Sequence, residues 1–311
     1  MSSESNFAIV FPGQGSQSLG MMNGLIEIQP SIKNIFNEAS EILSYDLLDV
    51  ITSGPEEKLN QTEMTQPALL ATAYATWLIL KEQSDITPSV LAGHSLGEYT
   101  ALLCANAISF EDAIALVAER GRCMQEAVPS GIGAMAAILG LEDEQVIQVC
   151  IDAAKSEIVS AANFNSPGQI VIAGHKAAVE RAIISAKDAG AKRAILLPVS
   201  VPSHCMLMKE AADKFETSLN NVTFNHANIP VLQNVDAKTK SSSNEIKTAL
   251  LEQLYKPVRW VESIHNIKSM NVSKIIECGP GKVLSGLIKR IDRDFELFPI
   301  QDKDSLEKVL I

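Results

Sequence analysis

A serine flanked by two glycines is the clearest candidate for chemistry in this chain. Gly93-His94-Ser95-Leu96-Gly97 matches the pattern G-x-S-x-G, in which a strand ends, the serine occupies a strained turn and a helix begins. The pattern alone arises by chance in roughly one chain in ten of this length. Here the apolar run 89–93 predicts the strand and 96–105 predicts the helix, which favours Ser95 as a nucleophile. The N–H of Leu96 would then point at a developing oxyanion.

A serine hydroxyl is a weak nucleophile unless a neighbouring base takes its proton. The candidates for that base are His94, His175, His204, His226 and His265. His94 adjoins the serine but projects in another direction, which favours packing or support of the side chains around the site. His175 lies at a strand-to-helix turn. His226 and His265 have polar neighbours and are typical of the surface. His204 lies where the chain leaves one predicted unit and re-enters another, a position that can face a cleft; position alone leaves the choice open.

The composition is that of a globular protein with an acidic surface. Hydrophobic residues make up 46% and charged residues 20%, and the net charge is −11 with no long basic run. This charge disfavours nucleic acid and anionic membrane surfaces as partners. The five cysteines lack C-x-x-C spacing, which favours a reduced protein over a disulfide framework or a metal site.

Two further features bear on location. The first residues, Met-Ser-Ser-Glu-Ser, lack the basic region of a secretory signal. The longest weakly apolar stretch, 68–80, is too short to span a bilayer. We therefore expect a cytoplasmic protein.

Strand and helix patterns alternate along the chain, which predicts an α/β fold whose large, α/β-hydrolase-like domain has a mostly parallel sheet. In the middle the order becomes β-α-β-β-α-β, the ferredoxin-like unit, with strands at 133–139, 158–163, 169–173 and 193–198 and helices at 143–155 and 176–189. Further strands are expected at 7–11, 229–234 and 274–277. We expect a large catalytic domain made of 1–129 and 199–311, with a small domain, 130–198, inserted between them.

Short polar signals predict where some helices begin and end. Ser109 with Asp112, and Ser242 with Glu245, match the spacing of a helix N-cap and its third residue. Gly190 occupies the place of a C-cap glycine after the helix 176–189.

Five segments together resemble the malonyl-CoA:acyl carrier protein transacylase family, in the family's order and over nearly the whole chain. They are FPGQGSQ at 11–17, GHSLGE at 93–98, Arg120-Gly121, VPSH at 201–204 and GPGK at 279–282. The resemblance implies that Ser95 is the acylated nucleophile and His204 its base. It also implies that the N–H groups of Gln14 and Leu96 form an oxyanion hole, in which one lost donor typically costs about 10²–10³ in rate. A phosphate-binding loop at 13–15 is disfavoured, because the P-loop ending and the G-x-G-x-x-G spacing are both missing.

Arg120 lies within a predicted helix, and the residues alone allow a solvated arginine paired with Glu119 or Glu126. In the family that this chain resembles, the matching arginine holds the free carboxylate of the malonyl group. A planar guanidinium suits that role because it can donate two parallel hydrogen bonds to a carboxylate. Arg122 is then the surface residue.

No Asp or Glu stands out as the third member of a triad. The resemblance instead implies that a main-chain carbonyl near Gln253 orients the imidazole of His204, and such an acceptor suffices to select a tautomer. Asn163 and Asn165, near Pro167, can line the cleft or shape a turn, and both interpretations remain open. Cys104 and Cys205 are expected to be buried.

The resemblance implies transfer of a malonyl group from malonyl-CoA to the phosphopantetheine thiol of acyl carrier protein, through a malonyl-serine ester, for fatty acid elongation. Coenzyme A is a product, and neither a metal nor a cofactor is implied. Acyl carrier proteins are acidic, so we predict a basic docking patch at Lys282, Lys289 and Arg290, although these residues also fit an ordinary surface helix. We expect a monomer. The alternatives are an ester hydrolase, an acyltransferase for polyketide synthesis or for methylmalonyl-CoA, and a catalytically silent carrier-binding module.

Overall fold

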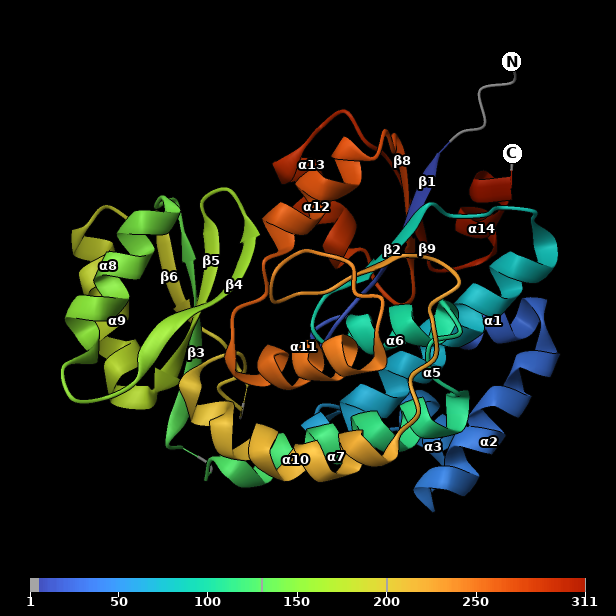
Figure 1. Ribbon diagram of the computed structural model, residues 1–311, viewed down its shortest axis with the longest axis horizontal. Helices are drawn as coiled ribbons and strands as arrows, with labels where there is room; N and C mark the ends of the chain where they lie inside the picture. The colour runs from blue at the N-terminus through green and yellow to red at the C-terminus, as the bar shows by residue number, and fades with distance from the viewer. Residues whose placement is uncertain (1–5, 130, 200, 311) are drawn as a thin grey trace.

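The computed structural model describes residues 6–129, 131–199 and 201–310, and it consists of two units that lie side by side (Figure 1). The larger unit contains a parallel five-stranded sheet in the order β7-β2-β1-β8-β9. Its strands are β1 (Phe7–Phe11), β2 (Val90–Gly93), β7 (Val231–Leu232), β8 (Lys274–Cys278) and β9 (Glu296–Ile300).

Alternation along β1 explains why helices cover both faces of this sheet. Ile9 and Phe11 belong to one buried cluster, whereas Ala8 and Val10 belong to another, because successive side chains of a strand point to opposite faces. The first face carries α5 (Thr62–Gln83), α6 (Gly97–Cys104), α7 (Phe110–Ala127), α10 (Lys209–Asn221) and α11 (Ser243–Tyr255). The second face carries α12 (Trp260–Ser269) and α13 (Val283–Ile291).

Further helices complete the large unit on the side away from the small unit (Figure 1). They are α1 (Asn23–Ile28), η1 (Pro30–Ile32), α2 (Lys33–Leu43), α3 (Leu47–Thr52), α4 (Glu56–Leu59) and α14 (Lys303–Leu310), while η2 (Met206–Met208) precedes α10. Within the described part of the chain, no helix is both long and apolar enough to cross a membrane.

The smaller unit has an antiparallel sheet in the order β4-β5-β3-β6. Along the chain its elements are β3 (Gly133–Leu139), α8 (Asp143–Ala154), β4 (Val159–Ser166), β5 (Gln169–His175), α9 (Lys176–Asp188) and β6 (Arg193–Leu196). Both helices share one apolar core with the sheet. The predicted fold class is therefore confirmed: a mostly parallel α/β sheet combined with a βαββαβ unit. The exact domain boundaries stay a prediction, since residue 130, like 1–5, 200 and 311, lies outside the described residues.

Main-chain hydrogen bonds join the two units along β4. Phe164 N donates to Val258 O at 3.0 Å, and Val258 N donates to Ala162 O at 2.9 Å. This places β4 at the edge of the large unit, where Asn165 contacts His94, the residue that follows β2.

The expected strand 229–234 is shorter than predicted. Only Val231–Leu232 pairs with β2, because Asn234 leaves the sheet and directs its amide to the turn that follows β2. The expected strand 193–198 likewise ends at Leu196, two residues before Pro198, which has no N–H to donate to a ladder.

Candidate active site

The turn that carries Ser95 requires glycine on both sides. Ser95 has a φ of 53°, in the left-handed region. A Cβ on Gly93 would lie 1.8 Å from the carbonyl carbon of Gly97, and one on Gly97 would lie 2.1 Å from Phe11 O. The chain can therefore turn this tightly only because both positions lack a side chain, and the turn lifts the serine hydroxyl above the start of α6.

His204 meets the serine from a segment more than a hundred residues away in sequence. Its Nε2 lies 2.8 Å from Ser95 Oγ. Its Nδ1 lies 2.6 Å from the main-chain carbonyl of Gln253, and since that oxygen can only accept, Nδ1 carries the proton and Nε2 is free to accept one. His204, at a φ of 62°, is only 3% exposed.

The surroundings of His204 keep its imidazole neutral. Burial, and secondly the positive charge of Arg120, lower the pKa of His204 to about 3. A neutral imidazole whose Nε2 faces a hydroxyl is in the form required of a general base.

Arg120 is 1% exposed, and its guanidinium lies beside the serine rather than in solvent. It donates to Gln66 Oε1 at 2.8 Å, to Gln253 Oε1 at 3.0 Å and to Ser95 Oγ at 3.3 Å. All three acceptors are neutral, and among the described residues Nε has no partner. A buried cation with only neutral partners favours an anionic ligand, because an unpaired charge in such a place is costly.

The ion pairs considered for Arg120 belong to Arg122 instead. Arg122 bonds Glu119 at 2.6 Å and Glu126 at 2.7 Å, on the exposed side of α7. The solvated interpretation of Arg120 is therefore wrong, because a step of two residues along a helix carries a side chain from the core to the surface.

A cavity of about 300 Å³ lies at this point between the two units. The large unit contributes Gln14, Ser95, Leu96, Arg120 and His204 to its walls, and the small unit contributes Met135, Asn163, Asn165, Gln169 and Val171. The structure thus gathers Ser95, His204, Arg120, Gln14 and Leu96 around one space, with Gln253 just behind it. Their catalytic roles remain predictions.

The loop that holds Gln14 packs directly on the serine turn. A Cβ on Gly13 would lie 2.4 Å from His94 O, so only glycine allows this approach. The approach brings the loop 13–15 to the same cavity as Leu96, as two donors of one oxyanion hole would require.

Asn163 and Asn165 lie within β4 and line the cavity, so the interpretation in which they shape a turn is wrong. Asn165 Oδ1 lies 2.8 Å from His94 Nε2, and the His94 ring packs edge-on to Trp260 with their centroids 5.5 Å apart. His94 therefore both packs on Trp260 and holds a cavity residue, the two roles that its position favours.

The remaining candidates lie away from the reacting groups. His226 and His265 are exposed, and His175 Nδ1 accepts from Ile158 N at 2.9 Å. Cys104 and Cys205 are buried. Among the described residues, no group of three or more His, Cys, Asp or Glu side chains is placed to hold a metal ion.

Sequence reasoning missed the side chains behind the nucleophile. Glu98 and Asn234 are both buried, and Asn234 Oδ1 accepts from Ser95 N at 2.7 Å. Gln66, also buried, holds Arg120. One signal was available for Glu98, a charged residue inside an apolar helix pattern, but neither Gln66 nor Asn234 belongs to any local pattern.

Comparison with known proteins places the chain among acyltransferases. The family model described as the acyl transferase domain matches residues 8–293. The chain is 52% identical over 304 residues to the malonyl CoA-acyl carrier protein transacylase of Haemophilus influenzae, with 97% of each protein covered. It is 53% identical over 285 residues to the protein of that name from Escherichia coli, with 92% of each covered.

Solved structures agree with these relatives. An acyl carrier protein S-malonyltransferase from Vibrio cholerae superposes with a TM-score of 0.96 at 55% identity, covering 98% of this chain and 100% of the other. A malonyl-transacylase in complex with a type II PKS acyl-carrier protein gives a TM-score of 0.97 at 52% identity, covering 98% and 99%. With the serine, histidine and buried arginine brought together in one cavity, these likenesses show that the chain belongs to the malonyl CoA-acyl carrier protein transacylase family.

Proposed function

We propose that this chain transfers a malonyl group from malonyl-CoA to the phosphopantetheine thiol of an acyl carrier protein, through a malonyl ester of Ser95, and so supplies fatty acid elongation. The observation that carries the proposal is the Arg120 guanidinium, buried among neutral acceptors 3.3 Å from the serine hydroxyl. A cation at that distance from the nucleophile favours an acyl group that ends in a carboxylate over a plain acyl group.

In the first half-reaction, His204 Nε2 takes the proton of Ser95 Oγ as the oxygen attacks the thioester carbonyl. The main-chain N–H groups of Gln14 and Leu96 stabilise the oxyanion that forms. The C–S bond then breaks, and His204 returns the proton to the departing coenzyme A sulfur, which leaves malonyl on Ser95.

In the second half-reaction, the phosphopantetheine thiol binds where coenzyme A was. His204 takes the thiol proton, the sulfur attacks the ester carbonyl, and the Ser95 oxygen leaves with the proton from His204. The steps use only protein groups and two thiols, so the proposed reaction requires neither a metal nor a cofactor.

Binding of the malonyl carboxylate should also strengthen the base. The charge of Arg120 is the second cause, after burial, of the low pKa of His204. A carboxylate on Arg120 offsets that charge, and the pKa of His204 rises towards the range in which imidazole accepts a proton readily. Malonyl recognition and serine activation are then coupled through one guanidinium.

The site favours transfer by this route over ester hydrolysis, because hydrolysis of simple esters has no use for a buried cation at the nucleophile. A monomeric state and a cytoplasmic location stay predictions from the sequence.

The test is intact-protein mass after rapid mixing with malonyl-CoA, methylmalonyl-CoA or acetyl-CoA, for wild type, Ser95→Ala and Arg120→Ala. We expect a malonyl-sized increment on wild type, none on Ser95→Ala and a strongly slowed one on Arg120→Ala. An acetyl increment as fast as the malonyl one, and insensitive to Arg120→Ala, would refute malonyl transfer. The absence of any increment after rapid quenching would favour a hydrolase or a silent binding module.

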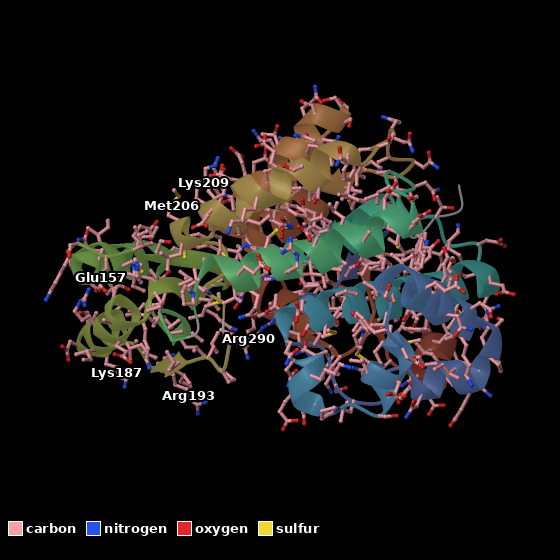
Figure 2. All side chains as sticks on the ribbon, turned by 90° about the horizontal axis from the view of Figure 1, so that it is seen from below. Glu157, Lys187, Arg193, Met206, Lys209 and Arg290 are labelled. Carbon is pink, nitrogen blue, oxygen red and sulfur yellow. The ribbon has the colours of Figure 1, made fainter. Side chains whose placement is uncertain are left out.

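For the carrier protein we propose a docking patch of Lys282, Lys289 and Arg290. All three are exposed. The same segment lies beside the cavity, which is lined by Val283, Leu284 and Leu287 of α13. Arg290 lies at the junction of the two units (Figure 2) and contacts Gln169 of the cavity wall. Positive charge beside the cavity mouth complements an acidic carrier despite the negative net charge of the chain.

Reversing the charge at Lys289 and Arg290 should raise the KM for acyl carrier protein several-fold while self-acylation by malonyl-CoA continues. A matched control reverses Lys187 of α9, which lies on the small unit away from that junction (Figure 2). Carrier kinetics that stay the same after reversal at 289 and 290 would refute the patch.

A further inference from the structure

Glu98 is a fully buried carboxyl group directly behind the serine turn. It lies in the first turn of α6 with 0% of its surface exposed. Its Oε2 accepts from Asn234 N at 2.7 Å and from Gln253 Nε2 at 2.9 Å. Among the described residues its Oε1 has no hydrogen-bond partner, so Oε2 accepts both of the hydrogen bonds that Glu98 makes.

The first of these contacts leads to the nucleophile. Asn234 accepts from Ser95 N at 2.7 Å and donates to Gly93 O at 2.7 Å, so its amide holds both sides of the strained turn. Glu98 in turn holds the main chain of Asn234. The left-handed conformation of Ser95 therefore depends on a chain of two hydrogen bonds that ends at Glu98.

The second contact leads to the malonyl-binding cation. Gln253 Nε2 donates to Glu98 Oε2 and, at 3.0 Å, to Ser95 O, while Gln253 Oε1 accepts from Arg120 at 3.0 Å. The Gln253 amide satisfies these contacts in one orientation only, because its N–H groups can donate but cannot accept. If the amide were turned over, its N–H groups would face the guanidinium, donor against donor. The acceptors supplied by Glu98 and by Ser95 O thus together select the orientation in which Gln253 holds Arg120.

We propose that Glu98 is a positioning residue that couples the serine turn to the malonyl-binding arginine, through Asn234 on one side and Gln253 on the other. This inference rests on the proposed function of Ser95 and Arg120. The Asn234 connection should act on the acylation rate with every acyl donor, because every donor uses Ser95. The Gln253 connection should in addition act on the KM for malonyl-CoA, because only a malonyl carboxylate uses Arg120.

The protonation of Glu98 shows which variant is conservative. Burial is the main cause that raises the pKa of Glu98, to about 8, although its two hydrogen bonds and Arg120 oppose the shift. At neutral pH the group is then mainly a neutral acid whose carbonyl oxygen does the accepting. Glutamine offers a neutral acceptor in the same place, whereas methionine fills a similar volume without one.

The experiment is rapid-quench acylation of Ser95 by malonyl-CoA and by acetyl-CoA, for wild type, Glu98→Gln and Glu98→Met. We expect Glu98→Met to lower the acylation rate with both donors and, in addition, to raise the KM for malonyl-CoA by about tenfold, the effect of losing the hydrogen bond from the charged Arg120 to a Gln253 that is no longer held in place. Glu98→Gln should keep both the acylation rate and the KM for malonyl-CoA close to the wild-type values. If Glu98→Met does not fold, Glu98→Asp replaces it, because the shorter side chain cannot reach both donors.

Glu277 supplies a matched control, since it is another glutamate with 0% exposure and bonds Leu284 N and Ser285 N instead. Glu277→Met should lower the unfolding temperature without changing the ratio of malonyl to acetyl KM. A double-mutant cycle between Glu98→Met and Gln253→Met should be strongly non-additive in the malonyl KM, because each variant breaks the same connection.

The outcomes separate the two proposals. Absence of malonylation of wild-type Ser95 would overturn the proposed function and this inference together. Malonylation of wild type, with a folded Glu98→Met variant whose malonyl-to-acetyl KM ratio is unchanged, would overturn the role of Glu98 alone. Additive effects in the double-mutant cycle would also overturn it.

Discussion

The two units meet at one cavity but contribute different chemistry. The large unit supplies the nucleophile, the base and the cation, of which His204 and Arg120 are buried and Ser95 is half-buried. Gln253 holds His204 through its main-chain carbonyl and Arg120 through its side-chain oxygen. The small unit supplies uncharged walls, with amides at Asn163 and Asn165 beside apolar Met135 and Val171. Reaction steps therefore depend on the parallel sheet and its loops, whereas the shape of the acyl pocket depends on an antiparallel sheet with its own core.

The cores of the two units support this division. The large unit packs helices on both faces of its sheet, with long side chains such as Phe11, Phe36 and Phe215 fully buried. The small unit packs helices on one face, with a core rich in alanine and valine. Apolar side chains stay exposed on its helices, among them Ile151 at 60% and Ile184 at 61%. A substitution in the cavity wall that the small unit forms should therefore lower the reaction rate less than a substitution among the reacting groups of the large unit.

The largest effect should come from the base. His204→Ala removes the proton acceptor 2.8 Å from the nucleophile, and general base catalysis is typically worth about 10²–10⁴ in rate. We expect the rate of Ser95 acylation by malonyl-CoA to fall by about 10³ in a rapid-quench assay. A loss smaller than tenfold in a folded variant would mean that another group, or water, serves as the base.

A smaller effect should follow from replacing the cation with one of different shape. Arg120→Lys keeps the charge but not the planar fork, so it cannot bond a carboxylate, Gln66 and Gln253 together. We expect kcat/KM for malonyl-CoA to fall by about 10² while that for acetyl-CoA changes little. Equal losses with both donors would show that Arg120 supports the fold rather than the carboxylate. The exposed Arg122→Lys is the matched control on the same helix.

A substitution in the cavity wall that the small unit forms should lower kcat/KM by a still smaller factor. Asn165→Ala removes the 2.8 Å contact with His94 but none of the groups that react. We expect a loss of about tenfold or less in kcat/KM, with the malonyl-to-acetyl preference retained. A loss as large as that of His204→Ala would contradict the division of labour between the two units.

The smallest effect should be that of mild acid on the base. The pKa of His204 lies at about 3, below the ordinary value of 6.5, so the imidazole of the free enzyme stays neutral when the pH falls from 7.5 to 5.5. We therefore expect kcat/KM for acylation, which reports the free enzyme, to lack an acidic limb near pH 6.5. A fall in kcat/KM with a midpoint near 6.5 would show that His204 titrates as an ordinary exposed histidine.

Local signals in the sequence predicted much of the fold because they act within a few residues. The strands 7–11 and 133–139 have the predicted bounds, and the N-caps form as expected, with Ser109 Oγ accepting from Asp112 N and a capping box at Ser242. Gly190 adopts a φ of +97°, as a C-cap glycine does. The serine turn is likewise local, since its glycines and its nucleophile are adjacent in the chain.

The remainder of the site depends on long-range contacts, for which the sequence has no pattern. Glu98 meets Asn234 across 136 positions and Gln253 across 155, and Arg120 meets Gln66 across 54. Polar residues of these types are common on protein surfaces. Only when they are buried in contact with one another does each side chain fix the orientation of its neighbour. The sequence alone thus determined the elements, the strained serine and the family resemblance. The tertiary structure decided which buried donors and acceptors hold that serine and its arginine in place, because hydrogen-bond partners so far apart in sequence are brought together only by packing the whole chain.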